Sequence, residues 1–169
     1  MQRFCCYIIL ICLSNRLWAQ PIIERLPFNT QESDEFSPGF YPGGIMFCSN
    51  AGRSLIIAHS DTTKYRNTQT DLYFVTAFGS YTSRPSLFST RLTTNTHEGP
   101  FSLSADKKTL YFTRSRIASN KPGNIKETAN YLGIFFSTRS GDSWMDPKPF
   151  MYNSDKYNVV HPALHPNGQ

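Results

Sequence analysis

Cysteine is scarce in this sequence, and most of it lies at one end. The 169 residues contain four cysteines, and three of them, Cys5, Cys6 and Cys12, come before Ala19. The rest of the chain keeps only Cys48, so it cannot form an internal disulfide. Cys48 ends the apolar run 45–48, which predicts a buried small hydrophobic residue rather than a reactive thiol.

Long hydrophobic runs are also missing, apart from one short run near the start. Residues 4–13 are apolar, but they are too few to span a bilayer, which takes about 20 residues. They follow Arg3 and are succeeded by a polar stretch and the small residue Ala19, a pattern typical of a signal peptide. The sequence therefore predicts a signal peptide over residues 1–19 and export of the chain. Cys12 is a poor lipidation site because the bulky Ile11 precedes it.

The chain has no strong excess of charge. Its formal net charge of +5 falls to 5 − 2 = +3 when Arg3 and Arg16 leave with the signal peptide. The remaining charges of both signs are scattered and form no basic run, so we do not expect nucleic acid as a partner. No later apolar segment is long enough for a transmembrane helix.

Motifs for catalysis or metal binding are absent too. The sequence has no Gly-x-Ser-x-Gly nucleophile elbow and no Gly-rich phosphate loop. His161 and His165 lie four residues apart, but in a predicted strand and turn this spacing does not stack them as it would on a helix. The other histidines and the carboxylate pairs have no evident partner base or nucleophile: His59, His97, Asp34 with Glu35, and Asp106 with Asp142. We therefore expect no enzyme activity, no cofactor, and no catalytic, cofactor-binding or metal-binding residues.

What the sequence does contain favours strands. The part of the chain that follows the signal peptide is rich in Phe, Tyr, Ser and Thr and shows no amphipathic helical pattern. The composition therefore predicts an all-β fold.

An internal repeat decides the architecture. Residues 37–47 align with 99–112, and a third copy begins at 161–169. The turn residues Pro42, Ala105 and Pro166 are separated by 105 − 42 = 63 and 166 − 105 = 61 positions. Such a period is typical of repeat architectures.

A second set of markers gives the same period. Phe28, Phe88 and Phe150 are separated by 88 − 28 = 60 and 150 − 88 = 62 positions, and the apolar run 71–76 recurs at 132–137. Each repeat then holds four short strands: one entering a turn, one leaving it, one of the Leu-Tyr-Phe type, and one near Phe88 or Phe150. The polar segments 49–70 and 116–130 are predicted loops between the second and third strands.

Four antiparallel strands per repeat are typical of a β-propeller blade, and a lone blade needs neighbours to bury both apolar faces. The sequence predicts an N-terminal strand or linker at 20–33 and the repeats at 34–169, with about two blades and the start of a third. Gly43, Gly44, Asn167 and Gly168 suit the positive φ of tight turns, whereas Asp106 suits it less.

These residues resemble the WD40-like Pro-Asp propeller repeat of TolB-type proteins and of periplasmic propellers joined to OmpA-like domains. The segments that carry the resemblance are 103–113 and 162–169, and residues 150–157 leading into His161 resemble the version that precedes OmpA-like domains. The sequence departs from the pattern at three turn positions: Gly43 and Asn167 replace an Asp, and Lys107 replaces a Gly. Residues 137–144 also resemble the Asp-box hairpin of sialidase-like propellers, with Arg139 in place of the Asp.

The resemblance implies an exported binding or scaffold module of the cell envelope, in the periplasm or associated with the outer membrane. With one blade per period, residues 20–169 hold only about 2.4 blades, so we expect the N-terminal piece of a longer protein. The expected partner is a protein or another envelope component, with peptidoglycan reached through an OmpA-like domain beyond Gln169. The alternative is an exported propeller glycoside hydrolase, which predicts a cluster of carboxylates and Arg at the central channel.

Two groups of residues complete the predictions. Asp and Asn at blade turns normally accept hydrogen bonds from local backbone amides, which predicts a structural role for Asp71, Asp106, Asp155 and Asn167. Tyrosines supply contact area at little entropic cost and are candidates for a recognition surface: Tyr65, Tyr81, Tyr152 and Tyr157.

Overall fold

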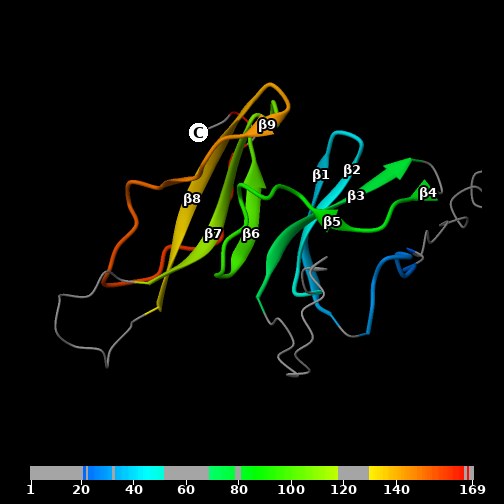
Figure 1. The fold of residues 1–169 in the computed structure, drawn as a ribbon, viewed down its shortest axis with the longest axis horizontal. Coiled ribbons are helices and arrows are strands. Elements are labelled where there is room, and N and C mark those ends of the chain that lie inside the picture. Colours follow the sequence, from blue (N-terminus) through cyan, green and yellow to red (C-terminus); the bar gives the residue numbers. More distant parts are fainter. Residues whose placement is uncertain are drawn as a thin grey trace, which may run out of the picture.

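The computed structural model of the chain describes residues 21, 23–31, 33–51, 69–78, 81–117, 130–165 and 167. These residues form strands and turns only, arranged as two antiparallel sheets (Figure 1). The prediction of an all-β fold is confirmed. The described part contains no helix that is long and apolar enough to cross a membrane. The predicted signal peptide, residues 1–19, lies outside the described residues.

The first sheet comes from the N-terminal part of the chain. Its order is β1–β2–β3–β4, and β5 also pairs with β3. The bounds are β1 Glu35–Tyr41, β2 Gly44–Ser49, β3 Asp71–Phe78, β4 Tyr81–Thr82 and β5 Ser86–Leu87. A two-residue turn joins β1 to β2, and Gly43 takes a φ of 84° there, as its lack of a Cβ permits.

The second sheet repeats this plan. Its order is β10–β8–β7–β6, and β9 also pairs with β8. The bounds are β6 Glu98–Leu103, β7 Thr109–Ile117, β8 Asn130–Ser140, β9 Ser143–Trp144 and β10 Lys148–Pro149. The segments 49–70 and 116–130, predicted as loops, fall largely outside the described residues. β7 ends at Ile117 and β8 begins at Asn130, so both strands reach into the predicted loop 116–130.

The pairings of β3 and of β8 with the strands that follow them match one period apart. Tyr73 pairs with Leu87 in the first sheet, and Phe135 pairs with Pro149 in the second, at positions one period further along the chain. The short hairpins β3–β4 and β8–β9 match in the same way, since the pair Ala77–Thr82 of the first corresponds to the pair Arg139–Trp144 of the second. β1 and β6 also carry an irregularity of register at the same place, after Phe36 and after Glu98 respectively. The repeat predicted from the sequence is therefore a repeat of backbone pairing.

A positive φ marks the same position three times. The residues Ser37, Gly99 and His161 have φ values of 52°, 99° and 56°, and each precedes a proline. Their spacings are 99 − 37 = 62 and 161 − 99 = 62. The third copy has no strand among its described residues, but its backbone already follows the repeat at this point.

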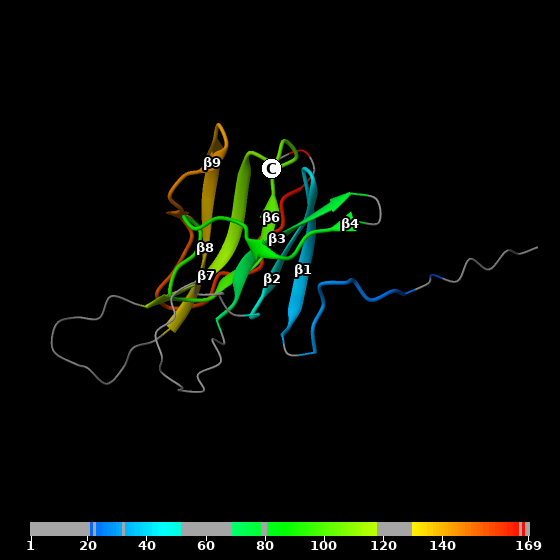
Figure 2. The ribbon, with the colours of Figure 1, turned by 45° about the vertical axis from the view of Figure 1, so that its right-hand side comes forward.

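The two sheets meet through an apolar core. β6 is the strand of the second sheet that contacts β1, β2 and β3 of the first, and it lies nearest to them in Figures 1 and 2. The fully buried members of this core come from both sheets and the loop between them: Met46, Cys48, Leu72, Leu92, Leu110, Phe112 and Trp144. Trp144, in the β8–β9 hairpin, contacts Phe88 and Tyr41, with ring centroids 5.6 Å and 6.5 Å away.

Residues 159–164 lie against the second sheet much as β6 lies against the first. The amide of Glu98 donates to the carbonyl of Thr70, and the amide of Val159 donates to the carbonyl of Leu132. The side chains next to these bonds also correspond. His97 accepts from the amide of Thr70 at 3.2 Å, and Asn158 accepts from the amide of Leu132 at 2.8 Å. Each repeat thus receives the next one in the same way.

Two details bear on the sequence predictions. The segment 20–33, predicted as a strand or linker, contains a turn and no strand among its described residues. In the β6–β7 turn the positive φ, 58°, belongs to Lys107 and not to Asp106. Lys107 is the residue that replaces the Gly of the repeat, so the backbone keeps the glycine conformation although a side chain is present.

Candidate functional site

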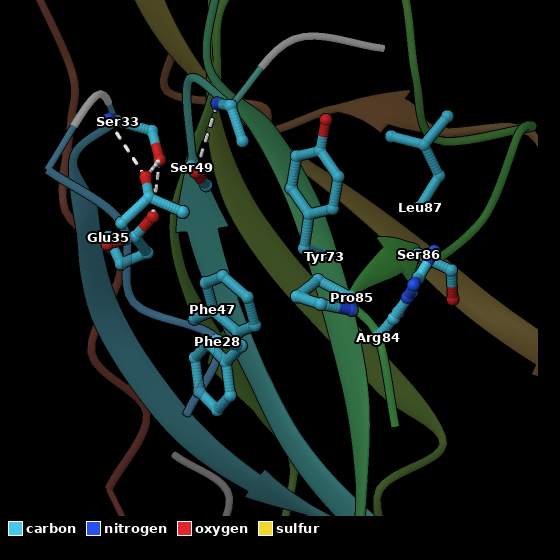
Figure 3. A pocket seen from close by; sticks show the side chains of 12 residues that line it. Phe28, Ser33, Glu35, Phe47, Ser49, Tyr73, Arg84, Pro85, Ser86 and Leu87 are labelled. Atoms are coloured by element: carbon cyan, nitrogen blue, oxygen red, sulfur yellow. Dashed lines mark hydrogen bonds between the residues drawn. The ribbon is translucent and has the colours of Figure 1, made fainter. Parts of the chain in front are cut away.

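A large hollow lies on the face of the first sheet that points away from the second. Its volume is about 720 Å³, and it is lined by β2, β3, β5 and the segment before β1. Figure 3 shows this pocket with its floor and rim.

The floor of the hollow is aromatic because odd-numbered residues of β2 and β3 share this face. Phe28 stacks on Phe47 with centroids 5.0 Å apart, and Phe47 lies 6.1 Å from Tyr73. Phe47, Tyr73 and Val75 form a small core of their own, with Leu87 packed against it. This core is separate from the one between the sheets, so each face of the first sheet is apolar, as predicted for a repeat that needs neighbours.

The rim of the hollow is polar. On one side Ser33 donates a hydrogen bond to Glu35 at 2.6 Å, and the amide of Ser33 donates to Thr30. Arg84 is exposed on the other side, beside Pro85 (Figure 3). A partner with apolar side chains at its centre and charges of both signs at its edge would match this arrangement.

The second sheet shows what covers the equivalent residues there. Phe47 pairs with Tyr73, and the equivalent pair in the second sheet is Phe112 with Phe135. Phe112 is fully buried in the core between the sheets, and Phe135 packs against it. The residues that face the hollow in the first sheet are therefore the counterparts of residues that protein side chains cover in the second.

A second cluster of polar residues lies buried where the two sheets meet. Glu98 at the start of β6 is 0% exposed, and Asp71 at the start of β3 is 1% exposed. Nε of Arg114 lies 3.2 Å from Oε1 of Glu98, close enough for an ion pair but not aligned for a hydrogen bond. The Arg114 guanidinium also lies over the rings of Phe112 and Phe135, at 4.9 Å and 5.1 Å from their centroids.

Burial shifts the pKa values of Glu98 and Arg114. It raises the pKa of Glu98 to about 7, with the neighbouring Asp71 adding to the rise, while Thr94 and Arg114 oppose it. Burial lowers the pKa of Arg114, and the attraction of Glu98 opposes that change. Sequence reasoning missed this cluster, because Asp71 and Glu98 are far apart along the chain and only the stacking of the sheets brings them together.

The cluster has the composition that the hydrolase alternative predicted, two carboxyls and an Arg, but not the access. Neither Asp71 nor Glu98 lines either of the hollows found among the described residues. A glycan would have to reach carboxyls that are almost completely buried.

The histidines do not come together. His161 is exposed in the chain that follows the second sheet, and its amide donates to Thr113 at 2.9 Å. The ring of His165 forms a hydrogen bond with Asn167, and the ring of His97 accepts a hydrogen bond from the amide of Thr70. Within the described ranges no three His, Cys, Asp or Glu residues are grouped so that they could hold a metal ion. His59 lies outside them.

Of the four residues predicted to hold turns, Asp106 and Asn167 interact with near neighbours in the chain. Asp106 accepts from Ser104 at 2.6 Å and from the amide of Lys108 at 3.0 Å, which lowers its pKa and confirms its role in holding the turn. Asn167 interacts with His165, two residues away. Asp155 instead forms an ion pair with Arg116 at 3.0 Å. Asp71 is buried at the start of β3, in a strand and not in a turn.

The remaining carboxylates are bound locally. Asp34 and Asn50 hydrogen-bond each other through two contacts, of 2.8 Å and 3.0 Å, at the start of the β1–β2 hairpin. Asp142 pairs with Arg139 in the β8–β9 hairpin, so the segment that resembles an Asp-box is a structural turn.

Of the candidate tyrosines, Tyr152 and Tyr157 are exposed, at 66% and 60%, on the segment after β10. Tyr65 and the side chain of Tyr81 lie outside the described residues. Cys48 is fully buried, and burial raises the pKa of its thiol to about 12, which confirms the prediction of a buried hydrophobic residue.

Comparison with known proteins adds nothing to this geometry. No protein-family model matches the chain, and no curated protein or solved structure is significantly similar to it.

Proposed function

We propose that the chain is an exported module of the β-propeller type that binds a protein partner in the cell envelope and catalyses no reaction itself. The proposal is supported by the repeat of backbone pairing, by the propeller resemblance of the sequence and by the signal-like segment 1–19. It places the chain in the periplasm or at the outer membrane.

The hollow on the first sheet is the observation that carries the proposal. Its floor of Phe47, Tyr73 and Leu87 is apolar, and the residues of the second sheet that correspond to Phe47 and Tyr73, namely Phe112 and Phe135, belong to the core between the sheets. Apolar faces rimmed by polar residues mark interaction sites. A protein surface fits this hollow better than a glycan, because the repeat supplies a protein-covered example of the same surface.

The proposal can be tested by photo-crosslinking in the native host. A benzophenone amino acid is placed at Arg84, on the rim of the hollow, and in a matched chain at Asp142, on the tip of the β8–β9 hairpin. We expect the Arg84 probe to capture one envelope protein and the Asp142 probe not to capture it. Replacing Leu87 by Asp should abolish the adduct.

Two results would contradict the proposal. One is equal capture of the same proteins at both positions. The other is that cell fractionation finds the chain unprocessed in the cytoplasm.

A second candidate function is an exported glycoside hydrolase, for which the buried cluster has the two carboxyls and the Arg, although neither carboxyl lines a hollow of the described residues. Carboxyls with separated roles and a raised pKa are the groups such enzymes use. If this function holds, the wild-type chain releases nitrophenol from an aryl glycoside and Glu98→Gln does not. The binding proposal predicts no release by either chain.

A further inference from the structure

The face of the first sheet that carries the hollow is the same face by which the second sheet docks. Phe112 of the second sheet lies in the core between the sheets, and Phe47 is its counterpart in the first. In the second sheet this face is therefore covered by a sheet of the same plan. In the first sheet Phe28, from the segment before β1, stacks on part of the face, and the hollow lies beside it.

The open surface extends beyond the hollow, towards the β1–β2 turn. Phe40 faces Ile45 in the register of the first sheet, and the corresponding pair of the second sheet is Leu103 with Leu110. Leu110 is fully buried and Leu103 packs against the core between the sheets, whereas Phe40 is 83% exposed. The same position is core in one sheet and surface in the other, because the two sheets of the described residues cover only one face of the first.

The other faces of the two sheets are engaged within the chain. The second face of the first sheet forms the core with β6 and its neighbours. The outer face of the second sheet is crossed by residues 159–164, where the amides of His161 and Leu164 donate to the hydroxyls of Thr113 and Ser102. Two copies of the chain would therefore meet through the same face of each, the one that carries the hollow.

The charges on the rim are arranged for such a contact. Glu35 and Arg84 lie on opposite sides of the hollow (Figure 3). The ion pairs within the described part of the chain include neither of them. When one face of a protein meets the same face of a second copy, a two-fold axis relates the two. An axis that runs between Glu35 and Arg84, in the plane of contact, places Glu35 of each copy opposite Arg84 of the other.

We propose that the hollow binds a second copy of this chain, in a two-fold dimer with two Glu35–Arg84 ion pairs around an apolar centre. This inference rests on the proposed function, because the second copy is then the protein partner that the hollow receives. The burial of the apolar face stabilises the dimer, and the ion pairs fix its orientation. Packing of two sheets face to face is common in proteins.

The test measures the mass of the purified full chain and its variants by gel filtration with light scattering. We expect the wild-type chain to have the mass of a dimer. Glu35→Arg and Arg84→Glu each place like charges at both contacts, so each should raise the dissociation constant roughly tenfold or more. The matched control is Asp142→Arg, which makes the same change of charge as Glu35→Arg at the exposed β8–β9 hairpin and should dimerise as the wild type does.

The two-fold symmetry makes a sharper prediction. In a mixture of the Glu35→Arg chain and the Arg84→Glu chain, every contact between unlike copies again joins opposite charges. The mixture should therefore form a heterodimer, although neither variant dimerises well alone. The chain that has both substitutions should dimerise with itself for the same reason.

Three results would overturn the dimer. The first is a monomeric wild-type chain at the highest concentration that stays soluble. The second is a dimer whose dissociation constant Arg84→Glu leaves unchanged, and the third is a mixture of the two single variants that stays monomeric. Circular dichroism shows that each variant is folded. If Glu35→Arg does not fold, Arg84→Glu decides alone, because Arg84 is exposed.

The dimer and the proposed function can fail separately. If the photo-probe at Arg84 captures a different envelope protein and the purified chain is monomeric, the second copy is excluded as the partner and the binding function stands. If that probe captures the same proteins as the probe at Asp142, the binding function itself fails. Capture of a second copy at Arg84 alone supports both.

Discussion

The two sheets have the same backbone plan and different side chains at the same places. Each pairing of the third strand recurs one period later, but Val75 becomes Ser137, and Asp71 becomes Gly133. The hydrogen bonds that follow β5 and β10 also recur, since Phe88 donates to Leu72 and Phe150 to Ile134. The repeat therefore preserves the backbone geometry and leaves the chemistry of each junction free to vary.

The faces of the two sheets also differ in what covers them. One face of the first sheet and one face of the second are buried against each other, while the remaining face of the first carries the hollow. Equivalent residues such as Phe47 and Phe112 thus sit in different surroundings. Pairs of this kind allow the effect of packing to be separated from the effect of the residue itself.

The largest expected difference concerns these two phenylalanines. Phe112→Ala empties the centre of the junction and should cost about 4 kcal/mol of unfolding free energy, as for other buried Phe residues. Phe47→Ala also removes a buried ring, 3% exposed, but beside a hollow that is open to solvent, and we expect the lower cost of about 3 kcal/mol. Urea unfolding followed by circular dichroism gives both values. Equal costs would show that the two faces are packed alike.

The glycines test the close approach of the sheets. Gly99→Ala places a Cβ against the sulfur of Cys48 at a φ of 99°, and should cost about 3 kcal/mol. Gly43→Ala has a φ of 84° but nothing within 4 Å of the new Cβ, so only about 1 kcal/mol of backbone strain is expected. Thermal unfolding of both variants provides the measurement. If Gly43→Ala is the more damaging change, the sheets do not meet at Gly99.

The pH dependence of stability distinguishes the junction from the rest of the molecule. The unfolding free energy of the wild-type chain should fall by up to about 3 kcal/mol between pH 4.5 and 7, because Glu98 holds its proton in the folded chain and loses it on unfolding. Glu98→Gln should lack this decline. Denaturant titrations across this range compare the two chains, and parallel curves would remove Glu98 as the cause.

The smallest effect is expected in the β8–β9 hairpin, which can be compared with the β3–β4 hairpin. Asp142 is fully exposed and pairs with Arg139 in the β8–β9 hairpin, whereas the β3–β4 hairpin has Ala77 in place of that Arg. Surface ion pairs contribute little to stability. Asp142→Asn should leave the melting temperature unchanged in calorimetry, at low salt and at high salt. A clear fall would mean that this hairpin depends on the pair.

The repeat and its strands could be predicted from the sequence because they depend on local patterns. Apolar runs mark the strands, and X-Pro and Gly mark the irregular positions, as at Ser37, Gly99 and His161. The turn at Asp106 was predictable for the same reason, since its hydrogen bonds reach only two residues.

The hollow and the buried cluster were not predictable, because they depend on contacts between distant residues. Asp71 has the sequence neighbours of a turn Asp, and only the docking of β6 shows that it is buried beside Glu98. The apolar content of β2 predicts burial on both faces, but not which face is covered and which forms a hollow. These features follow from how the sheets are stacked.

The central claim is that each repeat receives the next one on the same face. A crystal structure of the chain tests it most directly, by superposing the first sheet on the second and applying the same rotation to β6. The account predicts that β6 then falls on residues 159–164. If these residues run along another face or edge of the second sheet, the claim is contradicted.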